Sequence, residues 1–159
     1  MLAPLLATLA LTSAPADLNA LFADTLPQVK AKTSLAILLP DALPTESETL
    51  YPSGSGTRRE YAFALGAVPG CGGANACFVA EFTARKGGRP FGRGRATLAR
   101  GRHGRFQPLS CGASCSPPSI SWHERGATYS IQANVEASKR SDRQALVAMA
   151  NDAITHGPR

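Results

Sequence analysis

Two stretches of the chain alternate strictly between apolar and polar side chains, which is typical of β-strands with one face on a core. They are EYAFALGAV (60–68) and CFVAEFTAR (77–85). We predict a strand in each stretch. The side chains expected to face the core are Tyr61, Phe63 and Leu65 in the first and Phe78, Ala80 and Phe82 in the second.

A second pair of alternating runs predicts a β-hairpin. ISWHE (120–124) and ATYSIQANV (127–135) are separated by Arg125 and Gly126, which form a plausible two-residue turn. Directly paired residues share a face. The apolar face would then hold Ile120, Trp122, Tyr129 and Ile131, and the polar face Ser121, His123, Thr128 and Ser130. Trp122 is thus expected in the core and His123 at the rim, whereas a slip of one residue would exchange the two faces.

Helical spacing occurs near both ends of the chain. Residues 141–154 carry an apolar stripe, and Ser141 with Gln144 can form a capping box at its start. A shorter stripe follows Asp17, and we expect this helix to break near Thr25 because a proline follows closely.

The segment between the first helix and the first alternating run divides into two parts. SLAILLP (34–40) predicts a buried strand, and residues 41–59 are rich in turn formers and predict a crossing over the surface. Within that crossing, GSGT (54–57) resembles a phosphate-binding loop only loosely, and we interpret it as a flexible turn.

These elements predict one α+β domain. Its antiparallel sheet would have about five strands, with the C-terminal helix and a short N-terminal helix packed on one face. The length of 159 residues suits a single domain with a real core.

The N-terminus has the pattern of a secretory signal. An apolar run from Leu2 to Leu11 is followed by Ala14 and Ala16 in an A-x-A arrangement. We predict a signal peptide over residues 1–16, a mature domain over 17–159 and a secreted or periplasmic location. No Lys or Arg precedes the apolar run, so a buried or frayed N-terminal helix is the alternative. No other apolar run is long enough to cross a bilayer.

The four cysteines are spaced as CGGANAC and CGASC, and an even count in an exported chain favours disulfides. Three connectivities are possible. We favour the local pairs Cys71–Cys77 and Cys111–Cys115, because the neighbouring glycines permit tight backbone turns. Four-cysteine zinc and a catalytic redox pair are the alternatives, although these spacings fit neither motif well.

No catalytic constellation is evident. The chain has no G-x-S-x-G elbow, no Walker loop and no H-E-x-x-H, because His123-Glu124 is followed by Arg-Gly-Ala. The acidic residues are scattered, and His103 and His156 are expected at the surface. We therefore predict that the protein is not an enzyme and uses no cofactor and no metal.

The charge is concentrated in one segment. Residues 85–105 hold eight Lys or Arg and no acidic residue, whereas the rest of the chain holds nine basic and eleven acidic residues. The net charge of +6 therefore originates in this segment. Such a run can bind an anionic polymer or an anionic membrane surface, or it can be a solvated loop without a partner. The candidate anion-binding residues are Arg89, Arg93, Arg95, Arg100, Arg102 and Arg105.

Several motifs together carry a family resemblance: ILLPDALP, CGGANACFVAEFTA, HGRFQPLSCGASCSPPSISWHERGATYSI and ALVAMANDAI. In this order, between about residues 37 and 154, they resemble a group of uncharacterised exported bacterial proteins of the cyanobacterial type. The resemblance implies an exported, compact single domain and implies no activity. The arginine-rich stretch is longer and more basic than the group would lead one to expect.

The sequence thus predicts an exported, disulfide-stapled, non-enzymatic domain that binds an anionic envelope component through residues 85–105. Two other classes stay open. One is a structural envelope protein without a ligand, and the other is a hydrolase whose site is assembled from distant segments.

Overall fold

The fold is seen in a computed structural model that describes residues 14–135 and 137–159. Most of the predicted signal peptide, residues 1–16, lies outside the described residues, so its cleavage stays a prediction. The elements in chain order are β1 (Ala16–Asp17), α1 (Leu18–Leu21), α2 (Leu26–Lys30), β2 (Ala42–Leu43), β3 (Tyr51–Thr57), β4 (Glu60–Gly66), β5 (Phe78–Lys86), β6 (Gly94–Thr97), the 3-10 helix η1 (Ala99–Gly101), β7 (His103–Gln107), β8 (Ser110–Cys111), β9 (Cys115–Ser116), β10 (Ser119–Glu124), β11 (Ala127–Ala133) and α3 (Asp142–His156).

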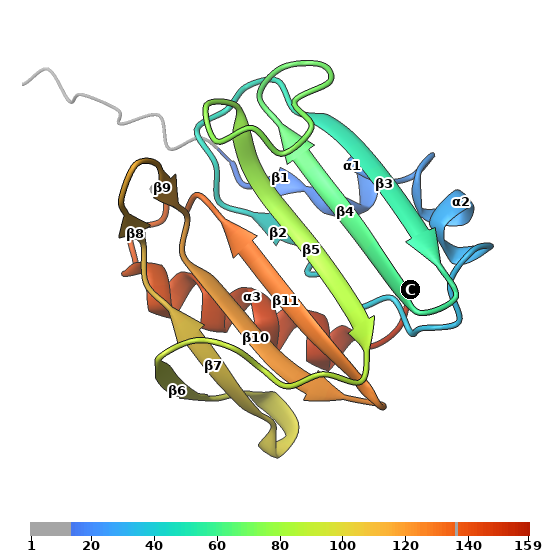
Figure 1. Ribbon diagram of the computed structural model, residues 1–159. Helices are drawn as coiled ribbons and strands as arrows, with labels where there is room; N and C mark the ends of the chain where they lie inside the picture. Colours follow the sequence, from blue (N-terminus) through green and yellow to red (C-terminus); the bar gives the residue numbers. More distant parts are fainter. Residues whose placement is uncertain (1–13, 136) are drawn as a thin grey trace, which may run out of the picture.

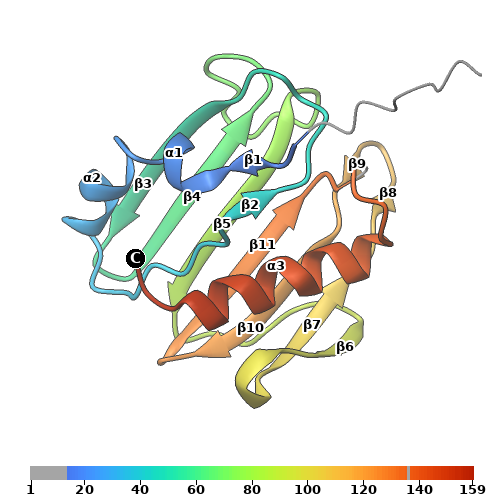
Figure 2. The same ribbon diagram turned by 180° about the vertical axis from the view of Figure 1, so that it is seen from behind.

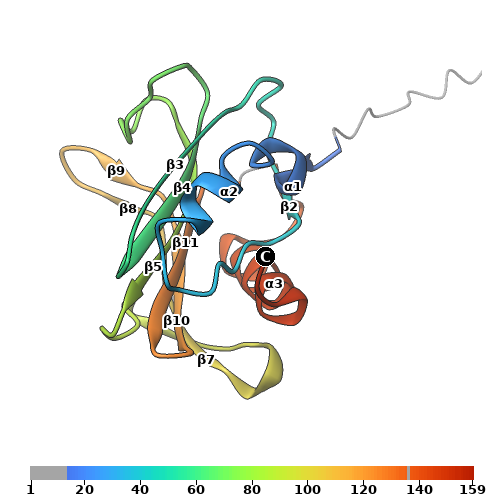
Figure 3. The same ribbon diagram turned by 90° about the vertical axis from the view of Figure 1, so that its right-hand side faces the viewer.

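The α+β architecture is built on one antiparallel sheet in the order β3-β4-β5-β11-β10-β7-β6 (Figure 1). Helix α3 lies across β11 and β10, and the N-terminal segment with α1 and α2 lies over β3 and β4 (Figure 2). Seen edge-on, all three helices cover the same side of the sheet, and the β8–β9 hairpin projects from the other side (Figure 3). We call the helix-covered side the inner face and the opposite side the outer face.

The predicted hairpin is confirmed with its register. Trp122 pairs with Tyr129 and His123 with Thr128 across β10 and β11. Trp122 is 1% exposed, its ring stacks on Tyr129 at 5.6 Å, and His123 is exposed. The apolar side of the hairpin is therefore part of the core under α3.

Both predicted helical regions are also confirmed. Helix α3 begins with the expected capping box of Ser141 and Gln144. The N-terminal stripe is split into α1, which Asp17 caps, and α2, which begins after Thr25. The break follows the position of Pro27, which suits the first turn of a helix and cannot sit in a helix interior.

The sheet has seven strands, so the expectation of about five was wrong. The first error is the strand predicted over residues 34–40, which is buried over 37–40 but joins no ladder. Side chains satisfy its backbone instead: Tyr61 Oη bonds to both Leu38 N and Leu38 O, and Tyr129 Oη donates to Ala36 O. Buried peptide groups need partners, and here two core tyrosines supply them in place of a neighbouring strand.

The second error is the stretch 41–59, which was predicted to cross the surface as a loop. It contains β2 and the seven-residue edge strand β3, so GSGT is strand rather than turn or phosphate loop. A Cβ atom on Gly54 would lie 2.4 Å from Thr25 Cγ2. The glycines that suggested a turn are required because α2 packs directly against the strand.

The third error concerns the arginine-rich stretch, which forms β6, η1 and β7 as well as a connecting segment. Ala96 and Gly104 pair with each other and lie buried. A Cβ atom on Gly104 would lie 2.8 Å from Leu98 Cδ1. The small residues thus let this strand pair close the sheet at its second edge.

Phe78 was expected on the core side of its strand and is not. A β-bulge shifts the register between Leu65 and Gly66, so that Ala80 pairs with Leu65 and Phe78 with Gly66. Val79 is buried, whereas Phe78 is half-buried and lines a hollow on the outer face together with Glu81. Bulges commonly redirect one side chain in this way.

Both local disulfides are confirmed. Cys71 is bonded to Cys77 and Cys111 to Cys115, so no cysteine is left to bind zinc or to act as a free thiol. Within the described ranges, no helix is long and apolar enough to span a membrane.

The last residue of the chain connects the N-terminal segment to α3. Arg159 N donates to Ile37 O, and its guanidinium bonds to Leu39 O and, at 2.6 Å, to the Asp41 carboxylate. The hydrogen bond from Asn19 and then that from Arg159 lower the pKa of Asp41 to about 2. His156 Nδ1 lies 3.2 Å from the other Asp41 oxygen. We call Asp41, Asn19, His156 and Arg159 the terminal clasp.

Candidate anion-binding groove

The strand pair β6–β7 sets the direction of the arginines. Arg95 pairs with Arg105 and Thr97 with His103, while Ala96 and Gly104 fill the alternate positions. Since Ala96 and Gly104 are buried against the core, Arg95 and Arg105 lie on the outer face. Two guanidinium groups that are ten residues apart in the chain are thus cross-strand neighbours.

The connection from β5 to β6 brings in a third arginine. It crosses the outer face in front of β11, β10 and β7 (Figure 1). Thr128 Oγ1 donates to Gly87 O, and Ser121 Oγ accepts from Phe91 N and donates to Phe91 O, each at 2.8 Å. Ser121 lies on the polar face of the hairpin, as predicted, and the connection buries it completely.

Gly92 lets this connection lie flat on β7. Its φ of 123° is unfavourable for other residues, and a Cβ atom there would lie 2.8 Å from Phe106 C and O. The crossing is therefore a packed part of the structure rather than a free excursion. It holds Arg89 and Pro90 beside the outer face of β6 and β7.

A fourth arginine reaches the same place from the helix on the inner face. Arg143, in the first turn of α3, extends to the edge strand, where its guanidinium donates to Arg95 O and lies 5.8 Å from the centre of the Phe106 ring. Sequence reasoning missed Arg143 because it lies outside the basic segment. In the sequence it is marked only by its position near the start of a predicted helix, and this position does not indicate that it lies next to β6.

These residues enclose a groove of about 730 Å³, which we call the arginine groove. Its lining residues are Arg89, Pro90, Arg95, Ala96, Thr97, His103, Gly104, Arg105 and Arg143. Four of the nine carry a permanent positive charge and none is acidic. Its lining contains no Phe, Tyr or Trp, the side chains on which nucleic-acid bases most often stack.

The remaining predicted arginines do not join the groove. Arg102 donates to the buried Glu124 carboxylate at 3.0 Å, and Arg100 donates to Thr155 O at the end of α3. Arg93 is exposed and does not line the groove. The structure thus divides the six candidates into Arg89, Arg95 and Arg105, which line the groove, and Arg93, Arg100 and Arg102, which do not.

Ion pairing separates the two sets further. In the part of the chain that the structure describes, no carboxylate forms an ion pair with Arg89, Arg95 or Arg105. Arg102, by contrast, compensates Glu124, whose side chain is only 3% exposed. The pKa of Tyr129 is raised to about 12, mainly because its hydroxyl group is buried and in second place because of the negative charge of Glu124. Arg102 is therefore a structural partner of a buried acid and has little charge left for a ligand.

The chemistry of the arginine groove is that of anion recognition. Guanidinium groups present planar, paired N–H donors that match phosphate, sulfate and carboxylate oxygens. The lining includes one hydroxyl group, on Thr97, and one imidazole, on His103, both on the same face as the arginines. Residues 14–135 and 137–159 contain no cluster of three His, Cys, Asp or Glu suited to a metal ion.

Comparisons of the chain with protein-family models, with curated proteins and with solved structures gave no match.

Proposed function

We propose that this protein is an exported, non-enzymatic binding protein whose arginine groove takes a phosphate-bearing polymer of the cell envelope. The observation that carries the proposal is that Arg89, Arg95, Arg105 and Arg143, from the β5–β6 connection, β6, β7 and α3, line one groove without a carboxylate. Like charges repel, so an arrangement without counter-charges is stabilised when an anion occupies it.

Export is supported by the two disulfides, which persist in oxidising compartments, and by the A-x-A pattern before Asp17. A polymer is favoured over a single small anion because four guanidinium groups line one groove of about 730 Å³, which is more charge than one small anion would neutralise. Binding of this kind is driven largely by counterion release and carries little sequence specificity.

The test uses two matched triple variants. Arg89→Gln/Arg95→Gln/Arg105→Gln removes three charges from the groove, and Lys30→Gln/Arg58→Gln/Arg59→Gln removes three exposed charges from the β3 end of the sheet. Duplex DNA is the calibrated probe, because each phosphate contact adds about 0.9 to the slope of log affinity against log salt. We expect the groove variant to lose up to about 2.7 of that slope and the control variant to change it little.

Three probes distinguish the possible sources of phosphate: DNA, a phosphate-rich cell-wall polymer and vesicles of anionic lipid. The proposal expects the cell-wall polymer to bind at least as tightly as DNA, and the groove variant to lose both. Equal losses in the two variants would show that only net charge matters. If none of the three probes bound at about 50 mM salt, where screening is still moderate, residues 85–105 would be a solvated surface without a ligand.

A further inference from the structure

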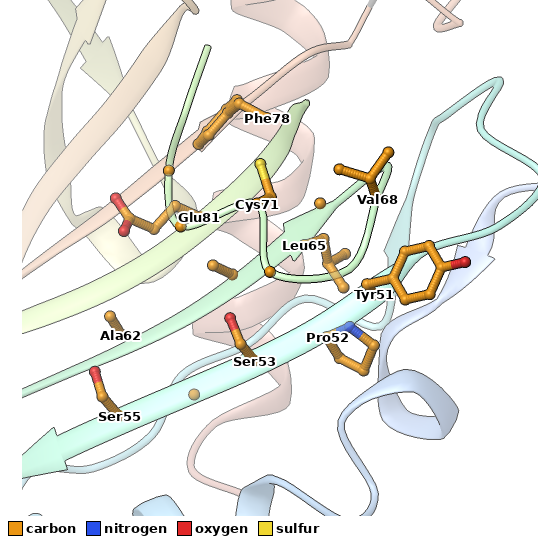
Figure 4. A pocket seen from close by; sticks show the side chains of 16 residues that line it. Tyr51, Pro52, Ser53, Ser55, Ala62, Leu65, Val68, Cys71, Phe78 and Glu81 are labelled. Carbon is orange, nitrogen blue, oxygen red and sulfur yellow. The ribbon is translucent and has the colours of Figure 1, made fainter. Parts of the chain in front are cut away.

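A second hollow lies on the outer face at the other end of the sheet (Figure 4). It measures about 490 Å³ and is formed by β3, β4, the start of β5 and the loop that the Cys71–Cys77 disulfide closes. It shares no lining residue with the arginine groove. We call it the Glu81 hollow.

The disulfide loop forms the roof of the Glu81 hollow. Ala67 N donates to Cys77 O, and Cys71 O accepts from Ala74 N, so both ends of the loop are fastened. Gly66 permits the close approach of the roof, because a Cβ atom there would lie 2.5 Å from Cys71 Cβ. The crosslink and the glycine thus hold the loop at a defined height over the sheet.

The β-bulge supplies an aromatic wall. It turns Phe78 from the core side to the outer face, where the ring stands beside the roof (Figure 4). Tyr51 and Val68 line the opposite side and are 39% and 48% exposed. A bulge that moves a large apolar ring out of the core has a cost in buried area, and a bound ligand would recover that area.

The floor is made of small side chains. Ser53 and Ser55 of β3 and Ala62 and Ala64 of β4 line the hollow; Figure 4 labels the first three. Ala62 and Ala64 alternate with the buried residues of β4, and Ser55 and Ser53 are their direct cross-strand partners, so the floor is the outer face of the sheet. Since none extends beyond a hydroxymethyl group, the hollow keeps its depth.

Glu81 is the only charged residue in the lining. Its cross-strand partners are Ala64 on one side and Gln132 on the other, both neutral. Within the described ranges, no Lys, Arg or His forms an ion pair with its carboxylate. The hollow therefore combines a single negative charge with apolar and aromatic walls.

From these features we infer that the Glu81 hollow binds a small organic cation, a primary amine on an apolar body. The ammonium group donates hydrogen bonds to the Glu81 carboxylate, and the apolar body contacts Phe78 and the alanine floor. A cation beside the Phe78 or Tyr51 ring gains further attraction from the ring quadrupole. The volume is in the range of ordinary small-ligand sites.

This inference does not depend on the proposed function, because the two sites prefer ligands of opposite charge. The probe is 2-phenylethylamine, titrated into the whole protein and followed by amide NMR shifts. Its neutral counterpart, 2-phenylethanol, has the same ring and chain without the charge. We expect saturable shifts at Ser53, Ala64 and Glu81, with a Kd of about 1 mM for a ligand of this size.

Two variants test the chemistry separately. Glu81→Gln should raise the Kd of the amine by about tenfold or more, which is the usual effect of losing a charge-assisted hydrogen bond. It should leave the Kd of the alcohol unchanged. Ala64→Leu fills the floor while leaving the charge of Glu81 in place and should weaken the binding of both probes. Glu60→Gln is the matched control, since Glu60 is an exposed carboxylate at the far end of β4 that pairs with Arg85.

Amide shifts that do not saturate, or equal affinity for the amine and the alcohol, would overturn the inference. So would an equal loss in Glu60→Gln and Glu81→Gln. All substituted side chains lie on the outer face, so a dispersed amide spectrum is expected for every variant. If Glu81→Gln fails to fold, the Ala64→Leu result and the comparison of amine with alcohol still decide the question.

Discussion

The two ends of the outer face differ in charge although they belong to one sheet. The β6–β7 end carries the arginine groove, which is lined by four arginines and no acid. The β3–β5 end carries the Glu81 hollow, which is lined by one acid and no base. The connection across β11, β10 and β7 lies between them and buries Ser121 on the way.

This difference shows how one small sheet can carry two hollows of opposite charge. The inner face is covered by α3 and the N-terminal segment, and both hollows lie on the outer face. A hollow on a sheet face needs a segment that rises above the strands. At the β6–β7 end the β5–β6 connection forms one wall of the arginine groove. At the β3–β5 end the disulfide loop and Phe78, which the bulge turns outward, form the walls of the Glu81 hollow.

The largest expected loss of stability comes from a core substitution on the inner face, and it tests whether both ends of the outer face depend on that core. Trp122→Ala should lower the free energy of unfolding by about 3 to 5 kcal/mol, because it removes a buried ring stacked on Tyr129. His123→Ala, on the outer side of the same strand, should stay within about 0.5 kcal/mol. Urea unfolding measures both, and a larger effect at His123 would mean that the assigned faces are wrong.

A smaller loss of stability, together with a loss of binding, is expected from a substitution at the arginine-groove end of the outer face. Gly92→Ala forces a Cβ atom against the Phe106 backbone at a φ of 123°. We expect a loss of about 1 to 3 kcal/mol and weaker polyanion binding, because Arg89 would be displaced. Binding of 2-phenylethylamine should not change.

Gly112→Ala is the control for this substitution, since a Cβ atom at Gly112 meets nothing within 4 Å. It should alter stability by less than about 0.5 kcal/mol. If Gly92→Ala weakened the amine as much as the polyanion, the two ends of the outer face would not be independent.

The smallest effect concerns the terminal clasp, which lies on the inner face away from both sites. The pKa of Asp41 is about 2 in the folded protein, below its unfolded value of about 3.9. The carboxylate therefore contributes stability above about pH 4, and this contribution is lost as the pH falls through about 2. Because the side chain is 45% exposed, we expect less than about 1 kcal/mol.

Asp41→Asn should flatten the dependence of stability on pH between about pH 4 and pH 2, as measured by urea unfolding at several pH values. Asp24→Asn, at an exposed aspartate outside the clasp, should leave that slope as it is. Neither variant should alter binding at either end of the outer face. An unchanged slope in Asp41→Asn would show that the clasp does not set the acid stability.

Local patterns were sufficient where a segment's neighbours in space are also its neighbours in sequence. The β10–β11 hairpin was predicted in its register because a two-residue turn fixes the pairing of both strands. The α3 cap and both disulfides, which close loops of only a few residues, were predicted for the same reason. Each of these features depends on interactions over short chain distances.

The candidate sites could be predicted only in part. The basic segment contained three of the four arginines of the groove, but its sequence could not separate Arg95 and Arg105 from Arg102. That separation depends on the strand register and on the buried Glu124, which lies 22 residues further along the chain. Arg143 and the whole Glu81 hollow were missed, since both combine segments that are distant in sequence.

Alternation, capping and short loops are local features, so the sequence was enough to predict the α+β class, the hairpin and the start of α3, and to favour the cysteine pairs that the structure contains. The tertiary structure alone decided that a Gly-rich stretch became edge strand β3, since α2 packs against Gly54 and leaves room for no side chain. It also decided that 34–40 joined no ladder, since Tyr61 and Tyr129 took its peptide groups as partners. In both cases long-range packing decided the structure against the local preference of the sequence. The same packing placed the groove arginines and Glu81 at opposite ends of the outer face.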